Sequence, residues 1–252
     1  MSYRHILYEK AGGIGWITLN RPEKMNALNA VMMNEWEEAI LAAGGDEEVG
    51  VVVVTGAGRA YCTGLDLKEL EGREFTRGEV GPDYDIPGNA VIEAIRAIPK
   101  VVIAMVNGPC ITGGLETLLA FDLIVASEEA VFGDTHARWG IRPSWGMSQR
   151  LPRMVGWMNA RELSFTARLF TAKEAREMGL VNRVVPAGRL RAEVISLAEC
   201  ILRNSLETVA AIKSLYNRGM TMPLKEALEM ESKTQFVITD TNERLKTFLK
   251  KK

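Results

Sequence analysis

The sequence predicts an α/β fold of stacked strand–turn–helix units, followed by a helical C-terminal region. Two apolar runs rich in β-branched residues, 51–55 and 101–106, are typical of strands buried on both faces of a parallel sheet. Each run leads into a glycine-bearing turn and then a helical pattern. From about residue 187 onward, apolar residues recur at helical spacing almost throughout. We therefore expect a core over residues 1–186 and a helical region over residues 187–252.

The remaining elements follow from alternation, capping and composition. Residues 5–9 and 14–19 flank Gly12-Gly13, which predicts an opening hairpin. Asn29 precedes a helical pattern as its N-cap, and short strands are expected over 123–126 and 131–132. Residues 72–90 are rich in glycine, proline and charge, which predicts a long loop. The C-terminal helices are expected over residues 190–202, 206–216, 224–236 and 242–249.

Composition excludes several classes of protein. The 252 residues carry a net charge of −1, so no global field favours nucleic acid. The apolar runs are too short to span a bilayer, and the N-terminus lacks an apolar signal core. The cysteines are Cys62, Cys110 and Cys200, an odd number without a C-x-x-C pair. They favour a reducing compartment over a disulfide framework or a zinc site, and we expect a cytoplasmic protein without a metal.

Two glycine turns are the first candidate site. They read CTGLDL around Gly64 and ITGGLE around Gly113-Gly114. A strand, a glycine and a helix start leave backbone N–H groups unpaired, and two such turns facing one another would form an oxyanion hole. Neither turn matches a nucleotide-phosphate or dinucleotide motif. The glycines also suit tight turns and close packing alone, and that alternative stays open at this point.

Four segments together resemble the enoyl-CoA hydratase/isomerase (crotonase) family. They are RPEKMNALN at 21–29, AYCTGLDLKEL at 60–70, VNGPCITGGLETLLAFDLIVAS at 106–127 and TAKEAREMGLVNRVVP at 171–186. The resemblance implies a crotonase-like spiral of ββα units with a C-terminal helical region that packs in trimers or pairs of trimers. It also implies acyl-CoA thioester substrates, no further cofactor, and oxyanion donors at the N–H groups of Leu65 and Gly113.

Glu116 follows Gly113 by three residues, in the first turn of the expected helix. A carboxylate is stabilised there by the helix N-terminus, and acidic residues often occupy first turns for that reason alone. The resemblance implies a different role, in which Glu116 helps to activate the water that adds to the β carbon.

His136 departs from the family pattern. The resemblance implies a second acid/base glutamate four residues after Phe132, and this chain has a histidine there. Histidine is a competent acid or base near neutral pH, so it suits proton transfer beside Glu116. It also suits orienting Glu116 or the water, or a structural bond to a backbone carbonyl or to Asp134. Some isomerase and dehalogenase branches carry an aspartate where this chain has Ser144, which disfavours those reactions.

The CoA end is expected, by the same resemblance, at Lys24, Ala27, Arg59, Asp66, Leu67, Phe248 and Lys251. Lys24 and Arg59 suit phosphates, and Asp66 and Leu67 continue the turn that the family folds around the adenine. Phe248 and Lys251 are expected to reach the CoA of a neighbouring subunit, although terminal lysines are also typical of a solvated tail.

Taken together, the sequence predicts an acyl-CoA-processing enzyme, a hydro-lyase that adds water to an α,β-unsaturated thioester or eliminates it. Isomerisation or hydrolysis with the same oxyanion hole remains an alternative. An RNA-binding role is disfavoured because no basic stripe with interleaved aromatics is present.

Overall fold

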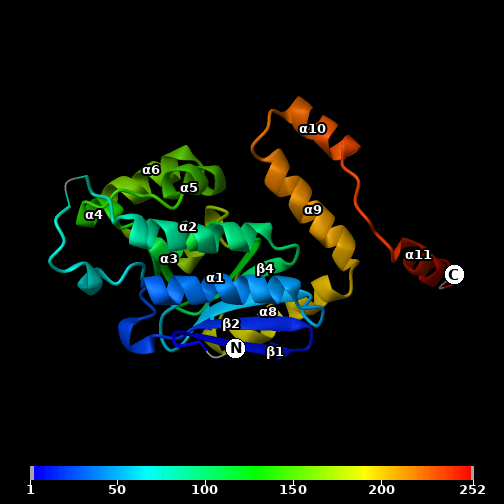
Figure 1. Ribbon diagram of the computed structural model, residues 1–252, viewed down its shortest axis with the longest axis horizontal. Coiled ribbons are helices and arrows are strands. Elements are labelled where there is room, and N and C mark those ends of the chain that lie inside the picture. Colours follow the sequence, from blue (N-terminus) through cyan, green and yellow to red (C-terminus); the bar gives the residue numbers. More distant parts are fainter. Residues whose placement is uncertain (1–2, 76, 251–252) are drawn as a thin grey trace.

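A six-stranded sheet forms the centre of the structure, a computed structural model that describes residues 3–75 and 77–250. The strand order is β1-β2-β3-β4-β6-β9, with β1 and β2 antiparallel and the other pairs parallel (Figure 1). The strands are β1 (Ile6–Ala11), β2 (Ile14–Leu19), β3 (Val51–Gly56), β4 (Val101–Val106), β6 (Leu123–Ser127) and β9 (Arg183–Val185). The predicted hairpin and the two fully buried strands are confirmed.

Alternate residues of the central strands face opposite helical layers. Val52 and Val54 face a core shared with α1 (Ala30–Gly45) and α2 (Pro82–Ala97). Val51 and Val53 face a smaller core with α8 (Leu190–Leu202). Helix α1 begins as predicted, because the Asn29 side chain accepts a hydrogen bond from Met32 N at 2.9 Å.

Helix α2 corrects the prediction of a loop over residues 72–90, since residues 82–90 are helical. Pro82 occupies the first turn, where a missing N–H costs nothing, and Asp83 and Asp85 suit the helix N-terminus. Pro87 lies inside the helix and is buried with Gly88. Packing of this face against the core outweighs the hydrogen bond that Pro87 does not donate.

A second, three-stranded sheet and several short helices lie beside the first sheet. The strands are β5 (Cys110–Ile111), β7 (Val131–Gly133) and β8 (Leu169–Thr171), in the order β5-β7-β8. The helices are α3 (Gly113–Leu118), α4 (His136–Trp139), α5 (Met147–Val155), α6 (Trp157–Thr166) and α7 (Ala172–Glu177). Strand β5 leads directly into α3 and β7 leads into α4, so this small sheet positions the start of both helices.

The C-terminal helices are α9 (Leu206–Gly219), α10 (Leu224–Lys233) and α11 (Thr241–Leu249). Helix α10 ends three residues before the predicted end at 236. Lys213 anchors α9, because its Nζ donates to the carbonyls of Ile95 and Lys100 at 2.9 Å and to Asp122 Oδ2 at 2.8 Å. Helices α10 and α11 bury no residue, and α11 projects away from the body (Figure 1). Among the described helices, none has the length and apolar character needed to cross a membrane.

Candidate active site

The two glycine turns meet at one side of the small sheet. Gly64 has φ +84, and a Cβ there would lie 3.1 Å from Gly113 N, while a Cβ on Gly113 would lie 3.4 Å from Gly64 Cα. A bridge to Leu28 holds the first turn, because Leu28 N donates to Gly64 O at 2.7 Å. Within the described part of the chain, neither Leu65 N–H nor Gly113 N–H donates to another protein group. The two expected oxyanion donors are therefore adjacent and unpaired.

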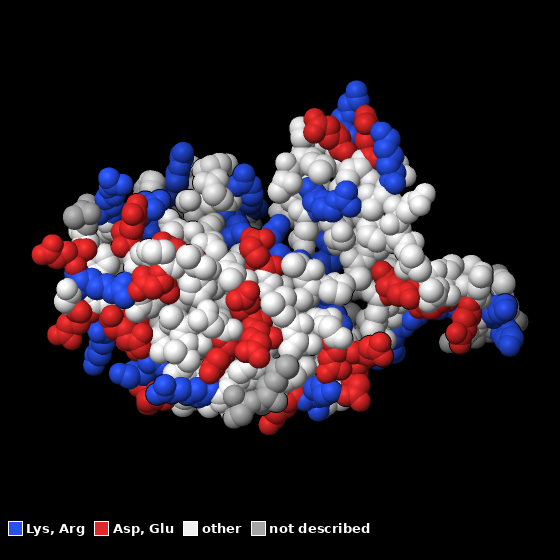
Figure 2. Space-filling view, in the orientation of Figure 1, with Lys and Arg blue, Asp and Glu red and all other residues white. Residues whose placement is uncertain are grey.

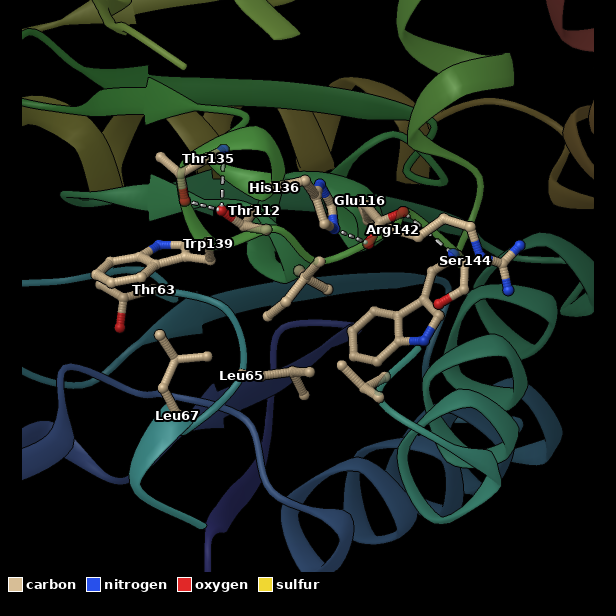
Figure 3. A pocket seen from close by; sticks show the side chains of 14 residues that line it. Thr63, Leu65, Leu67, Thr112, Glu116, Thr135, His136, Trp139, Arg142 and Ser144 are labelled. Atoms are coloured by element: carbon tan, nitrogen blue, oxygen red, sulfur yellow. Dashed lines mark hydrogen bonds and ion pairs between the residues drawn. The ribbon is translucent and has the colours of Figure 1, made fainter. Parts of the chain in front are cut away.

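One cavity brings the four predicted catalytic residues together. Its walls include Leu65, Gly113, Glu116, His136, Trp139 and Trp145. Figure 3 shows Glu116 and His136 pointing toward one another on one side of this cavity, with Leu65 and Leu67 on the other. A small molecule bound here would meet the unpaired N–H groups and two titratable groups within one cavity.

Thr112 joins the second glycine turn to the loop that carries His136. Thr112 N donates to Gly133 O at 2.8 Å, Thr112 Oγ1 accepts from Thr135 N at 3.2 Å, and the two hydroxyls bond to one another. Thr112 has φ 49 and ψ −105, a strained conformation that costs on the order of 1–3 kcal/mol. This backbone conformation of Thr112 turns the chain sharply just before Gly113 and thereby sets the direction of the Gly113 N–H.

Glu116 is held by backbone donors from a distant part of the chain. It lies on α3 and is only 2% exposed, and its Oε1 accepts from the N–H groups of Trp145 and Met147, both at 3.1 Å. Its Oε2 lies 3.4 Å from His136 Nε2. The carboxylate is therefore fixed by one oxygen, and the other faces the imidazole.

His136 lies between two carboxylates and is 7% exposed. Its Nδ1 is 2.7 Å from Asp134 Oδ1, and its Nε2 faces Glu116. Burial alone would lower the pKa of His136, but the bonds to Asp134 and Glu116 outweigh it and raise the pKa to about 9. Burial alone would raise the pKa of Asp134, yet the bonds from His136 and Ser164 hold it below its usual value. The two carboxylates therefore favour the imidazolium form of His136, in which both ring nitrogens are donors.

Trp145 forms a wall of the cavity, between α2 and α3. A Cβ on Gly88 would lie 2.3 Å from Trp145 Cε2, and one on Gly113 would lie 3.0 Å from Trp145 Cζ3. The indole Nε1 donates to Asp85 Oδ1 at 3.1 Å. Helix α2, unexpected at this point in the sequence, thus supports the residue whose N–H orients Glu116. Trp139 also lines the cavity and is more than half exposed.

The residues expected at the CoA end are divided between the cavity and its surroundings. Leu67 lines the cavity, and Lys24 and Arg59 are exposed. Buried Arg21 donates to the Ala27 carbonyl at 2.6 Å and to Asp66 Oδ2 at 3.0 Å. The Asp66 carboxylate is thus already engaged within the chain, and a ligand would meet the backbone of this turn.

Phe248, one of the two C-terminal residues expected to contact CoA, is not brought to the cavity within one chain. Phe248 is 63% exposed on α11, which lies at the opposite end of Figure 1 from α4. Lys251 lies outside the described residues. Both were expected to act on a neighbouring copy, so their role stays a prediction.

Other ligand classes find little support on the described residues. Among them, no group of three or more His, Cys, Asp or Glu side chains is placed to hold a metal ion. Figure 2 shows lysine and arginine interspersed with aspartate and glutamate, without a continuous basic stripe on the face in view.

Comparisons with known proteins identify the family of this chain. Residues 9–252 match the sequence profile of the enoyl-CoA hydratase/isomerase family. The chain is 42% identical to a probable peroxisomal enoyl-CoA hydratase of Arabidopsis thaliana over 88% of this chain and 82% of that protein. It is 38% identical to a probable enoyl-CoA hydratase of Rhizobium meliloti over 100% of this chain and 97% of that one. A crystal structure of a Bacillus anthracis enoyl-CoA hydratase superposes with a TM-score of 0.91 at 32% identity, covering 99% of this chain and 97% of that chain.

Proposed function

This chain belongs to the enoyl-CoA hydratase/isomerase family, and we propose on that premise that Glu116 and His136 add water across an α,β-unsaturated acyl-CoA. Family membership makes the protein an acyl-CoA enzyme of the hydro-lyase type. The observation that carries the roles is geometric: a carboxylate and an imidazole face each other at 3.4 Å in the cavity that holds two unpaired N–H groups.

The N–H groups of Leu65 and Gly113 would hold the thioester oxygen. When water attacks the β carbon, the electron pair of the double bond moves toward the carbonyl, and this oxygen becomes enolate-like. Two preorganised donors stabilise that charge more than they stabilise the ground-state carbonyl. Because both donors are backbone groups, the side chain of Leu65 is free to form part of the cavity wall.

Glu116 and His136 would divide the two proton transfers. Glu116 takes a proton from water as its oxygen bonds to the β carbon, and His136 Nε2 gives a proton to the α carbon as the enolate collapses. Glu116 is then a neutral acid and His136 a neutral imidazole. Passing the proton from Glu116 to His136 Nε2 restores both groups for the next turnover.

The histidine leaves the proton count of a two-glutamate site unchanged. Two glutamates that share one proton carry a net charge of −1. Here Asp134, His136 and Glu116 together also carry −1 when the imidazole is charged, with one transferable proton and one free base. The pKa of His136, raised to about 9, keeps that proton available at neutral pH.

A panel of enoyl-CoA thioesters tests the reaction type. We expect loss of the enone absorbance, a mass gain of one water and no release of free thiol. Thiol release would make the protein a hydrolase, and a shifted double bond at unchanged mass would make it an isomerase.

The assembly is proposed to be a trimer or a pair of trimers. Apolar side chains are exposed along α9 and α10, including Tyr216, Leu224 and Leu228, and α11 buries none of its residues. Exposed apolar faces of this kind are unusual on a monomer, and they are typical of the surfaces that subunits bury against one another. Light scattering on the purified protein is expected to give three or six chains, and a monomer at micromolar concentration would contradict the proposal.

Two further predictions accompany this function. We propose that the reaction uses no cofactor beyond the CoA of its substrate, so activity should survive exhaustive dialysis against a chelator. A cytoplasmic location is also proposed, supported by the absence of any disulfide among the three cysteines. Cell fractionation tests it, since the Arabidopsis relative is named as peroxisomal.

A further inference from the structure

Asp134 has no part in the proton transfers above, yet it is the closest charged neighbour of His136. It is 2% exposed and lies on the short loop between β7 and α4. We propose that Asp134 is a positioning residue of the reaction: it fixes the orientation and the charge of His136, so that Nε2 faces Glu116 and the substrate as a proton donor. This inference rests on the proposed function.

A single oxygen of Asp134 fixes both the ring and the backbone of His136. Oδ1 accepts from His136 Nδ1 at 2.7 Å and from His136 N at 3.2 Å. A ring rotated by half a turn would place carbon atoms where Nδ1 and Nε2 now lie. It would lose the short bond to Asp134 and the contact with Glu116 Oε2 together. The bond to Asp134 therefore selects the ring orientation in which Nε2 reaches the reacting centre.

Asp134 also faces a residue of another helix. Burial alone would raise the pKa of the Asp134 carboxyl, but His136 and Ser164 on α6 lower it. Helix α6 packs beside α4, so the side chains of Ser164, Asp134, His136 and Glu116 follow one another from α6 to α3. Partners on both sides of the Asp134 carboxylate keep its position when the substrate enters, and the imidazole retains its orientation.

The charges around His136 favour the imidazolium. Glu116 faces it from α3 and Asp134 from the preceding loop. The nearby cations are engaged elsewhere. Arg138, on α4 with His136, donates to the Ala167 carbonyl at 2.8 Å. Arg142 pairs with Glu79 at 3.1 Å, and Arg161 on α6 lies 5.6 Å from the ring centroid of Trp157. Removing the charge of Asp134 therefore leaves one carboxylate on the ring and lowers the pKa of His136.

Asp134→Asn tests the proposal, because asparagine keeps an acceptor oxygen of similar size and removes the charge. In the pH profile of kcat/KM, which reports groups of the free enzyme, the alkaline limb should move down by about one to three units. KM should change little, since Asp134 does not face the thioester. Asp134→Glu keeps the charge and should lie nearer the wild type. An alkaline limb of Asp134→Asn that coincides with the wild type would overturn the proposal.

Introducing Asp134→Asn into the His136→Glu variant distinguishes a role of Asp134 in positioning His136 from a general role in the stability of the fold. In His136→Glu, the acid/base group no longer needs Asp134 as a partner, and two carboxylates lie side by side. Adding Asp134→Asn there should leave the rate unchanged or raise it. A loss equal to that in the wild-type background would show that Asp134 only supports the fold, and the proposal would fail.

Nitrogen NMR of the imidazoles tests the same inference without turnover. The chain has only two histidines, so His136→Gln assigns the signals. In the wild type we expect His136 to be charged at neutral pH with both nitrogens protonated, and Asp134→Asn should lower its titration midpoint. A neutral His136 with an unprotonated Nδ1 would refute the inference even if hydration is observed. Conversely, a charged ring in a protein without hydratase activity would refute only the proposed function.

Discussion

Replacing Glu116 with glutamine removes the proposed base while preserving its shape. The two backbone donors from Trp145 and Met147 lie at 3.1 Å from Oε1, so the amide oxygen must occupy that position. The amide NH₂ then faces His136 Nε2, 3.4 Å from the present Oε2. Because both groups are donors, the contact becomes repulsive, and the variant loses both the base and the partner of the imidazolium.

The expected loss of rate follows from these two effects. Loss of a general acid or base lowers kcat by about 10²–10⁴-fold. With the imidazolium also misplaced, we expect kcat to fall by about 10³-fold or more, equivalent to roughly 4 kcal/mol of transition-state stabilisation. The oxyanion donors are untouched, so the dissociation constant of a saturated acyl-CoA should not change.

The assay is the disappearance of the enone absorbance under single-turnover conditions, with calorimetry for binding. Glu129→Gln is the matched control, since Glu129 is exposed in the turn between β6 and β7. A Glu116→Gln enzyme whose kcat stays within about tenfold of the wild type would refute the role of Glu116 as base.

Three further changes test other parts of the structure. His136→Gln should remove the alkaline limb of the rate profile. Because the pKa of His136 in the folded protein is raised to about 9, its ion pairs stabilise the wild type fully below pH ~6.5, and this stabilisation is lost as the pH rises through about 9. Urea unfolding of the wild type and the variant at several pH values checks this. Lys213→Met removes the ion pair of the partly buried Asp122 carboxylate and should destabilise the fold by about 3 kcal/mol. Lys233→Met, at an exposed helix pair, should cost less than about 1 kcal/mol, and equal urea-unfolding midpoints for the two variants would contradict this. Gly64→Ala should reduce kcat by about 10²–10³-fold, because the added Cβ separates the two glycine turns. Gly72 is the control, since it has a similar φ of +80 but open space around it. A similar loss of kcat in Gly72→Ala would contradict the reasoning.

Much of the sheet was predictable because its signals are local. The β-branched runs that become β3 and β4 are buried on both faces, and Asn29 caps α1 through its own side chain. Helix α2 was not predictable in its first half, because two prolines and a glycine within seven residues are typical of a loop. Only contact with the core, including the wall residue Trp145 against Gly88, decides in favour of the helix.

The candidate site was predictable where residue types or glycine turns carry the signal, and not where backbone donors come from a distant segment. The motifs placed Leu65, Glu116 and His136 in one site, and the structure brings them to one cavity. The N–H groups that orient Glu116 leave no trace in residue type. The bond between Asp134 and His136 was one of several alternatives in the sequence, and the structure shows that it coexists with the contact to Glu116.

The most direct test of water addition by this site is turnover in water enriched in heavy oxygen. With an enoyl-CoA substrate, we predict that the label enters only the hydroxyl on the β carbon, and that the thioester remains intact and unlabelled. Label in the carboxylate of a free acid, together with release of CoA, would contradict the account.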